Sequence, residues 1–161
     1  MIAWIMLPLD LIRSANEMIA ANRGKPSQVS LRRATSSAYY AMFHCLARCC
    51  ADLLIGGTNS DRSKPAWRQT YRALEYGTAK TACRDGDIKK FPKEIEDFAN
   101  QFVILQEARH KADYDPLERF YKSSVQADVR LAEETIKAFQ NSSTKDRRAF
   151  AAFVLFRKSR R

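Results

Sequence analysis

The feature that most constrains this chain is an apolar stripe with helical spacing through residues 31–53, a stretch that contains no glycine or proline. Apolar residues that recur every three or four positions lie on one face of an α-helix. Only five glycines and five prolines occur among the 161 residues, and few breaks favour long helices over a many-turned β fold. We therefore predict an all-α protein. The stripe consists of Leu31, Ala34, Ala38, Met42, Leu46, Cys49 and Leu53.

The same spacing predicts about five main helices in an up-and-down bundle. Asp10 is a plausible N-cap for the first of them. The segment 77–91 has no dominant pattern, and Gly86 marks a turn in it. The apolar segment 149–156 is predicted to be a helix on the body or at a subunit interface, after a cap of Ser143 and Asp146. The predicted helices cover residues 11–21, about 27–55, 66–76, 92–115 and 117–140.

We expect one domain over residues 1–161, with its core in about 9–140 and an extension in 141–161. The net charge is +10, and residues 144–161 contribute +6, from seven basic side chains and one acidic. Such a chain suits a polyanion such as RNA as partner. The alternative is that the basic end only keeps the protein soluble.

Metal, disulfide and membrane chemistry are not predicted. Cys45, Cys49, Cys50 and Cys83 form no C-x-x-C pair, and the two histidines complete no zinc pattern. We expect reduced thiols, no metal and no cofactor. The apolar start MIAWIMLPL lacks a basic leader and is short for a secretion signal, and Met6 is an alternative start. No run reaches the ~20 apolar residues of a membrane span, so we expect a cytoplasmic protein.

Arg109 is the anomaly of the predicted helix 92–115. Its position extends the apolar stripe Ile95, Phe98, Phe102 and Leu105. A guanidinium in such a position is costly unless it is paired. The partner is Asp113 one turn on, a neighbouring helix or a bound phosphate. Two interpretations follow, an internal ion pair or an anion-binding or catalytic arginine in a cleft.

Two sequence motifs resemble the HEPN family of small helical domains. One is the run R-A-x-x-x-A-Y-Y-A-x-F-H, at residues 33–44, and the other is R-H-K-A-D-Y-D-P, at residues 109–116. The resemblance covers roughly residues 9–140. It implies a helical bundle that often forms homodimers. Many relatives are metal-independent RNA-cutting toxins or defence nucleases, others bind RNA or nucleotides without cutting, and some are paired with a nucleotidyltransferase as antitoxin.

In the cutting relatives, the resemblance implies a motif of an arginine, a polar residue, a few spacers and a histidine, brought together in two copies by the dimer. Arg109 matches the arginine and His110 the polar residue. The histidine is missing, because Tyr114, Asp115 and Pro116 occupy its expected positions. Metal-free RNA cleavage needs an acid and a base, for which histidine suits best near neutral pH. The expected catalytic residues of an active enzyme are therefore Arg109 and His110, and the substitute base is His110 or His44.

Tyr40 and His44 form an i, i+4 pair on a face beside the main stripe, together with Arg32 and Ser36. They either line a cleft, where Tyr40 stacks on a base, or form an ordinary helix-face pair. Tyr39 is expected in the core.

We thus expect a protein that binds RNA or a nucleotide, as part of a toxin–antitoxin or defence system. Arg109 would hold a phosphate, and the expected binding residues are Arg109, His110, Asp113, Tyr114, Tyr40 and His44. One alternative is a metal-independent ribonuclease with a substituted histidine. The other is a non-enzymatic protein-interaction module in which Arg109 pairs only internally.

Overall fold

The computed structural model describes residues 6–156 and 158, and these form seven α-helices, one short 3₁₀ helix and no β-strand. The all-α prediction is therefore confirmed, with more helices than the five expected. The helices are α1 (Pro8–Gly24), α2 (Gln28–Leu54), α3 (Lys64–Ala73), α4 (Tyr76–Arg84), η1 (Gly86–Lys90), α5 (Lys93–Tyr114), α6 (Lys122–Gln140) and α7 (Thr144–Leu155).

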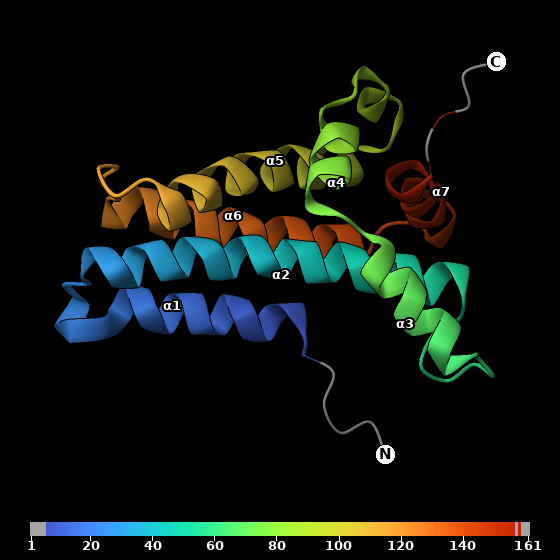
Figure 1. The fold of residues 1–161 in the computed structure, drawn as a ribbon, viewed down its shortest axis with the longest axis horizontal. Coiled ribbons are helices and arrows are strands. Elements are labelled where there is room, and N and C mark those ends of the chain that lie inside the picture. Colours follow the sequence, from blue (N-terminus) through green and yellow to red (C-terminus); the bar gives the residue numbers. More distant parts are fainter. Residues whose placement is uncertain (1–5, 157, 159–161) are drawn as a thin grey trace.

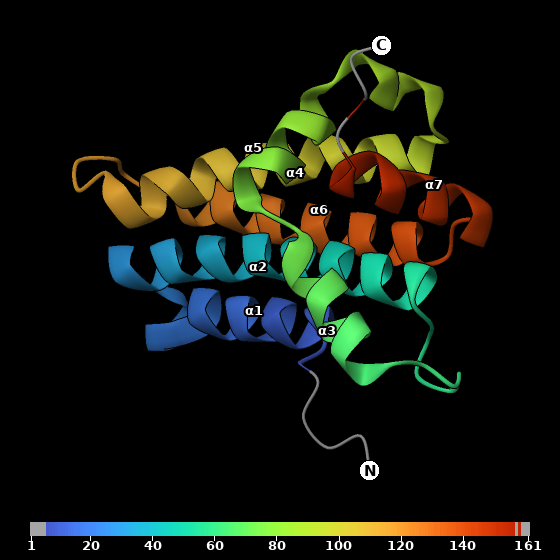
Figure 2. The same ribbon diagram turned by 45° about the vertical axis from the view of Figure 1, so that its right-hand side comes forward.

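Helix α2 lies at the centre of the molecule. It contacts α1, α5, α6, α7 and α3, while α4 packs on α5 and α7. The long helices α1, α2, α5 and α6 run along the long axis, and α3 and α4 cross them on one side (Figures 1 and 2). Beyond the predicted apolar stripe, α2 also buries residues on its other faces, so it needs neighbours on several sides.

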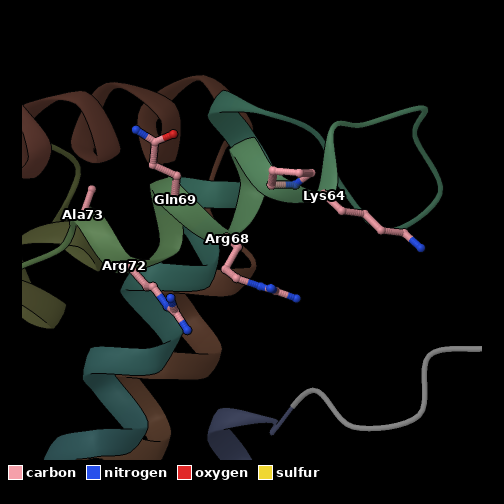
Figure 3. A pocket seen from close by; sticks show the side chains of 6 residues that line it. Lys64, Arg68, Gln69, Arg72 and Ala73 are labelled. Carbon is pink, nitrogen blue, oxygen red and sulfur yellow. The ribbon is translucent and has the colours of Figure 1, made fainter.

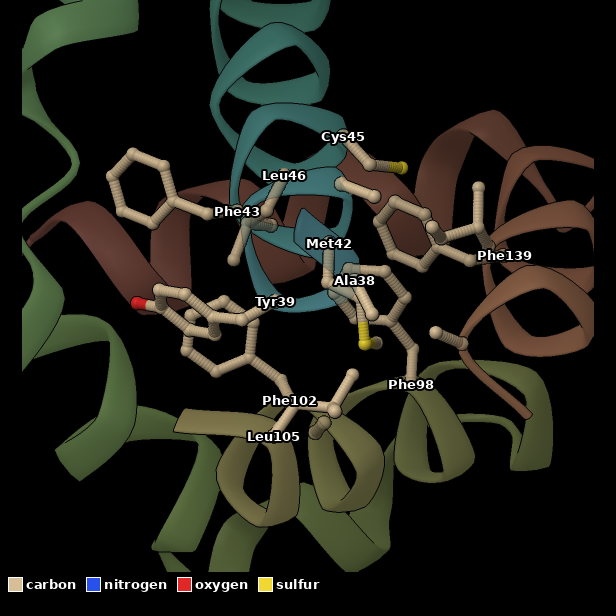
Figure 4. Close-up of a cluster of buried hydrophobic side chains, with 14 of the residues drawn as sticks. Ala38, Tyr39, Met42, Phe43, Cys45, Leu46, Phe98, Phe102, Leu105 and Phe139 are labelled. Atoms are coloured by element: carbon tan, nitrogen blue, oxygen red, sulfur yellow. The ribbon is translucent and has the colours of Figure 1, made fainter. Parts of the chain in front are cut away.

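The core gathers where α2, α5, α6 and α7 meet. The rings of Phe98 and Phe139 are stacked at 4.3 Å, and Phe150 of α7 lies edge-on to Phe139 at 5.9 Å. Figure 4 shows Phe98 and Phe139 of this group beside Met42 and Leu46 of α2. All five side chains are fully buried, and each contributes about 1.5–3 kcal/mol of burial free energy.

The start of α1 differs from the prediction, whereas its far end agrees with the predicted end at residue 21. The helix begins at Pro8, because proline suits a first helical position, and Leu7 rather than Asp10 is the N-cap. Asp10 lies in the first turn, where its charge favours the helix dipole. The far end leaves helical geometry at Ala21, and Asn22 and Arg23 adopt positive φ angles near 55°.

The predicted helix 66–76 is wrong in its boundaries, since α3 starts at Lys64 and ends at Ala73. Ser63 caps α3 by accepting a hydrogen bond from the Ala66 amide. Leu74 and Glu75 are extended, and Tyr76 then opens the separate helix α4. Buried Leu74 anchors this break to the core. The ambiguous segment 77–91 resolves into α4 and η1.

The fifth predicted helix starts later than expected, at Lys122 instead of 117, and Pro92 is the N-cap of α5 rather than its first residue. Tyr121, which lies inside the predicted helix 117–140, is the N-cap of α6 and 60% exposed. The connection at Phe120 is instead held by α2, because the Gln28 side chain donates to the Phe120 carbonyl and accepts from its amide.

Helix α7 docks on the body, which is one of the two positions expected for residues 149–156. Ser143 accepts a hydrogen bond from the Asp146 amide, which confirms the predicted cap, and Phe150, Ala151 and Val154 are buried. Of the basic end RKSRR, only Lys158 is described, and it forms salt bridges with Asp85 and Asp87. The rest of this end, and residues 1–5 before the alternative start Met6, lie outside the described residues.

The four cysteines are free and buried, and burial raises the pKa of each thiol, that of Cys49 to about 11 and that of Cys83 to about 12. These thiols are therefore protonated at neutral pH, as small core residues are. No group of potential metal ligands occurs in the part of the chain that the structure describes. Within that part, every helix is too short or too polar for a bilayer crossing.

Candidate anion-binding site

Arg109 lies in the last two turns of α5, where the predicted stripe turns inward. Its side chain is 13% exposed, so the guanidinium is largely withdrawn from water. The preceding stripe residues Phe102 and Leu105 are fully buried. Arg109 therefore places a cation at the edge of the core, where the spacing of the apolar residues in α5 predicts an apolar side chain.

Three tyrosine rings from two helices surround the guanidinium carbon of Arg109. The ring centroids of Tyr39 and Tyr40, both on α2, lie at 5.2 Å and 5.8 Å from it, and that of Tyr76, the first residue of α4, at 5.5 Å. Each ring attracts a cation by about 0.5–2 kcal/mol, depending on desolvation. The rings therefore offset part of the cost of burying the charge.

Asp113 is the charged partner of Arg109. Its Oδ2 accepts a hydrogen bond from Nη1 of Arg109 at 3.2 Å, and its Oδ1 accepts one from the Ser36 hydroxyl of α2 at 2.8 Å. Burial lowers the pKa of Arg109, but the bond to Asp113 and the nearby tyrosines raise it by more, so the net shift is upward. The Arg109–Asp113 pair of the internal ion-pair interpretation is thus present.

The pair leaves part of the guanidinium unused. Among the residues that the structure describes, Nε of Arg109 is buried without a hydrogen-bond partner, and so are the Tyr39 hydroxyl and Oε1 of Gln106. The three residues all contact Tyr76: Gln106 donates to the Tyr76 carbonyl at 3.0 Å, and the Tyr76 ring faces both Arg109 and Tyr39. Figure 4 shows the Tyr39 hydroxyl pointing away from the labelled core. Unpaired buried polar atoms are rare and often mark sites of function.

The phenols beside Arg109 do not serve as bases. Burial raises the pKa of Tyr39 well above its ordinary value, and although Arg109 lowers it, the net shift is strongly upward. Burial likewise raises the pKa of Tyr40. Both hydroxyls therefore stay protonated at neutral pH, and their chemical role is to donate hydrogen bonds and offer ring faces.

A second arginine, Arg32 of α2, holds the end of α5 in place. Its guanidinium donates to the carbonyls of Ala112 at 3.0 Å and Asp115 at 2.7 Å, and also to those of Lys111 and Glu118. These carbonyls include acceptors that a helix leaves free at its C-terminus, where a cation also complements the dipole. Arg32 therefore fixes the segment that carries Asp113.

A groove of about 540 Å³ lies next to this pair, between α1, α2 and the end of α5. Arg32, Arg33, Ser36, Tyr40 and Asp113 contribute to its wall. The side chain of Arg33 is exposed. The groove thus offers a ligand cationic side chains, hydroxyls and one aromatic face, the combination that suits a phosphorylated ligand.

The predicted site residues divide into three places. Arg109, Asp113 and Tyr40 come together as expected. His110 and Tyr114 are exposed and face one another at 5.0 Å, one turn apart on the outer side of α5. His44 bonds through Nδ1 to the Tyr71 hydroxyl of α3, and its ring lies 6.4 Å from Tyr40.

Neither histidine forms a hydrogen bond with Arg109 within the part of the chain that the structure describes. Burial lowers the pKa of His44, which keeps its imidazole neutral. A single chain therefore brings no acid–base pair to the guanidinium. This arrangement can bind and orient an anion, and it lacks the proton-transfer groups of metal-free RNA cleavage.

Three residues of the Arg109 site were not predicted from the sequence as site residues: Tyr39, Tyr76 and Ser36. Tyr39 is in the core as expected, with no exposed surface, yet its ring also faces Arg109. Ser36 stands in the i, i+4 row with Tyr40, so its spacing was a usable signal. Tyr76 had no such signal, because it was assigned to the end of a helix rather than to the start of α4.

The fold and site define an all-α protein with an arginine–tyrosine cluster beside a basic groove. Comparisons with models of known protein families, with curated proteins and with solved structures found no match to this chain. Functional inference therefore rests on the geometry of the site and on the motifs of the sequence.

Proposed function

We propose that this protein binds the phosphate of RNA or of a nucleotide at Arg109. The observation that carries the proposal is a largely buried guanidinium that has, within residues 6–156 and 158, one carboxylate partner and an unpartnered Nε, with a basic groove at its side. An arginine that only stabilises the fold has its donors occupied, because an unpaired buried donor costs about 1–3 kcal/mol.

Tyr40 supplies the second half of this binding function. Its ring belongs to the groove wall and to the tyrosine cluster at once. A base that stacks on it would lie within reach of the cations Arg33 and Arg109. Stacking on one aromatic side chain contributes about 1–3 kcal/mol and accepts any base.

The family resemblance extends the proposal. We infer that α1, α2, α5 and α6 form the up-and-down bundle of a HEPN-like domain, that the protein is a homodimer, and that it acts in a toxin–antitoxin or defence system, with a nucleotidyltransferase-type antitoxin as candidate partner. His110 and Tyr114, exposed at the end of α5, would complete the site from the outer side. Binding is preferred over cutting because no histidine lies at the guanidinium.

The test compares Arg109→Met with Arg130→Met, since both remove one positive charge and Arg130 is an exposed residue of α6. Purified proteins are incubated with mixed cellular RNA in EDTA and run on a gel that reports both cleavage and band shift. We expect wild type to shift RNA without cutting it, Arg109→Met to bind at least tenfold more weakly, and Arg130→Met to stay within threefold of wild type.

Thermal unfolding followed by circular dichroism shows that both variants are folded. Cleavage by wild type that Arg109→Met abolishes would make the protein a ribonuclease in spite of the missing histidine. Absence of any shift by wild type, or equal losses in the two variants, contradicts the proposal and favours the protein-interaction module.

A further inference from the structure

The surface of α3 carries a line of three cations. Lys64, Arg68 and Arg72 are spaced by four residues, so they lie about 6 Å apart along one side of the helix. All three are exposed. Figure 3 shows their side chains extending from α3 in the same general direction. With Pro65, Gln69 and Ala73 they line a depression of about 570 Å³.

This line of cations, the α3 ridge, has no internal compensation. Helix α3 contains no acidic residue, and none of the three side chains forms a salt bridge to a carboxylate of residues 6–156 or 158. Residues 61–73 carry four basic side chains and one acidic, a net charge of +3. Like charges at i, i+4 destabilise a helix by about 0.2–0.5 kcal/mol per pair.

Unlike the ridge cations, the neighbouring basic residues form salt bridges. Arg48 and Arg62 both pair with Asp52, at 3.4 Å and 3.1 Å, and Trp67 donates to the same carboxylate at 2.8 Å. Asp52 is thus shared by three donors, none of which belongs to the ridge. The first turn of α3 adds the positive end of the helix dipole to Lys64.

A run of aromatic rings connects the ridge with the Arg109 site. Trp67 and Tyr71 lie on the adjacent face of α3, with ring centroids 5.2 Å apart. Tyr71 stacks on His44 at 5.9 Å, and His44 is followed by Tyr40 at 6.4 Å. Tyr40 in turn faces Arg109. The ridge and the Arg109 site therefore lie on elements that are in direct contact.

We propose that the α3 ridge binds the phosphate backbone of single-stranded RNA, as a second contact beside the Arg109 site. The inference rests on the proposed function, since it takes RNA rather than a free nucleotide as the ligand. Uncompensated cations that follow one line, next to aromatic side chains, are the combination by which proteins hold a single strand. The ridge supplies affinity without base preference, because it contacts only phosphates.

The experiment neutralises two ridge cations and compares them with two cations elsewhere. The ridge variant is Arg68→Gln with Arg72→Gln, and the control is Lys89→Gln with Arg130→Gln, whose side chains are exposed and form no salt bridge within the described residues. Both remove two charges, and glutamine is a good helix former. Affinities for a labelled single-stranded RNA and for a labelled mononucleotide are measured by fluorescence anisotropy over a range of salt.

We expect the ridge variant to bind the RNA at least tenfold more weakly and its salt slope to fall by about 1.4, because each phosphate contact contributes about 0.7 for a single strand. Mononucleotide affinity and the control variant stay at wild-type values. Equal losses in the two double variants, or a loss confined to the mononucleotide, overturn the ridge as a binding surface.

The outcomes also separate the ridge from Arg109. If Arg109→Met loses RNA while the ridge variant binds like wild type, the ridge proposal is overturned and the proposed function stands. If the ridge variant loses RNA while Arg109→Met binds like wild type, the proposed function fails and the ridge is upheld. Wild type that binds duplex RNA more tightly than the single strand overturns the choice of ligand.

Discussion

Two arginines at the contact between α2 and α5 each place a charged guanidinium partly out of water, and they differ in the partners that compensate for this. Arg32 directs its guanidinium to four backbone carbonyls and to the Phe120 ring at 5.2 Å. In the described part of the chain, Arg109 has one carboxylate and three rings as partners, and its Nε has none. Within the described residues, Arg32 uses both of its terminal nitrogens for hydrogen bonds to the main chain, whereas Arg109 uses only Nη1. The difference teaches that the number of occupied donors, rather than burial alone, distinguishes a structural arginine from a binding one.

The largest effect is expected at Arg32. Arg32→Met removes the donors to the end of α5 and should lower the free energy of unfolding by about 2–4 kcal/mol, because charged donors are lost to several acceptors at once. The matched control is Arg33→Met, an exposed neighbour whose replacement should change stability by less than about 0.5 kcal/mol. Urea unfolding measures both. Similar values for the two variants would show that Arg32 is no more structural than a surface arginine.

The next effect concerns Asp113, the single carboxylate on Arg109. Asp113→Asn keeps an acceptor for Ser36 and removes the charge that competes with a phosphate. We expect about two- to fivefold tighter binding of labelled RNA, since a partly exposed pair is worth up to about 1 kcal/mol and 1.4 kcal/mol corresponds to tenfold. Anisotropy titration at constant salt provides the measurement. Unchanged or weaker binding would favour the purely internal ion pair.

A smaller effect is expected at the third ring. Tyr76→Leu keeps an apolar side chain against Phe43, whose ring lies 4.5 Å from that of Tyr76, and removes the contact with the guanidinium. The free energy of unfolding should fall by about 0.5–1 kcal/mol, the value of one partly exposed cation–π contact. In the background of Arg109→Met the same change should cost less, because the cation–π contact is already absent and only the ring contacts with neighbours such as Phe43 are lost. An additive loss in that double-mutant cycle would disprove the coupling of ring and cation.

The smallest effect is a dependence on pH through His44. Burial lowers its pKa, so the unfolded chain binds the proton more readily than the folded protein. Stability is therefore complete above the unfolded pKa of about 6.5 and decreases as the pH falls below it. Wild type should lose more stability than His44→Gln between pH 8 and pH 5, as measured by urea unfolding. An equal loss in both proteins would assign the acid sensitivity to other groups.

The sequence predicts the helical class and the unusual place of Arg109, because both follow from residue spacing along one helix. Asp113 and Tyr40 were predictable for the same reason. Tyr76 was not, because the break at Leu74 and Glu75 depends on Leu74 packing into the core and has no glycine or proline to announce it. The role of Arg32 could not be predicted either, because its partners are main-chain carbonyls, which every residue has and which leave no pattern in the sequence.

The attachment of the α5 end through its carbonyls has a consequence for how this protein can change. Arg32 recognises main-chain atoms at residues 111, 112, 115 and 118, so it is indifferent to the side chains that these residues carry. Substitutions at the exposed positions of this segment can alter what it presents to a ligand while its path stays the same. The main-chain path at the end of α5 is therefore fixed while its exposed side chains can vary, so new ligand specificities can be selected without a change of fold.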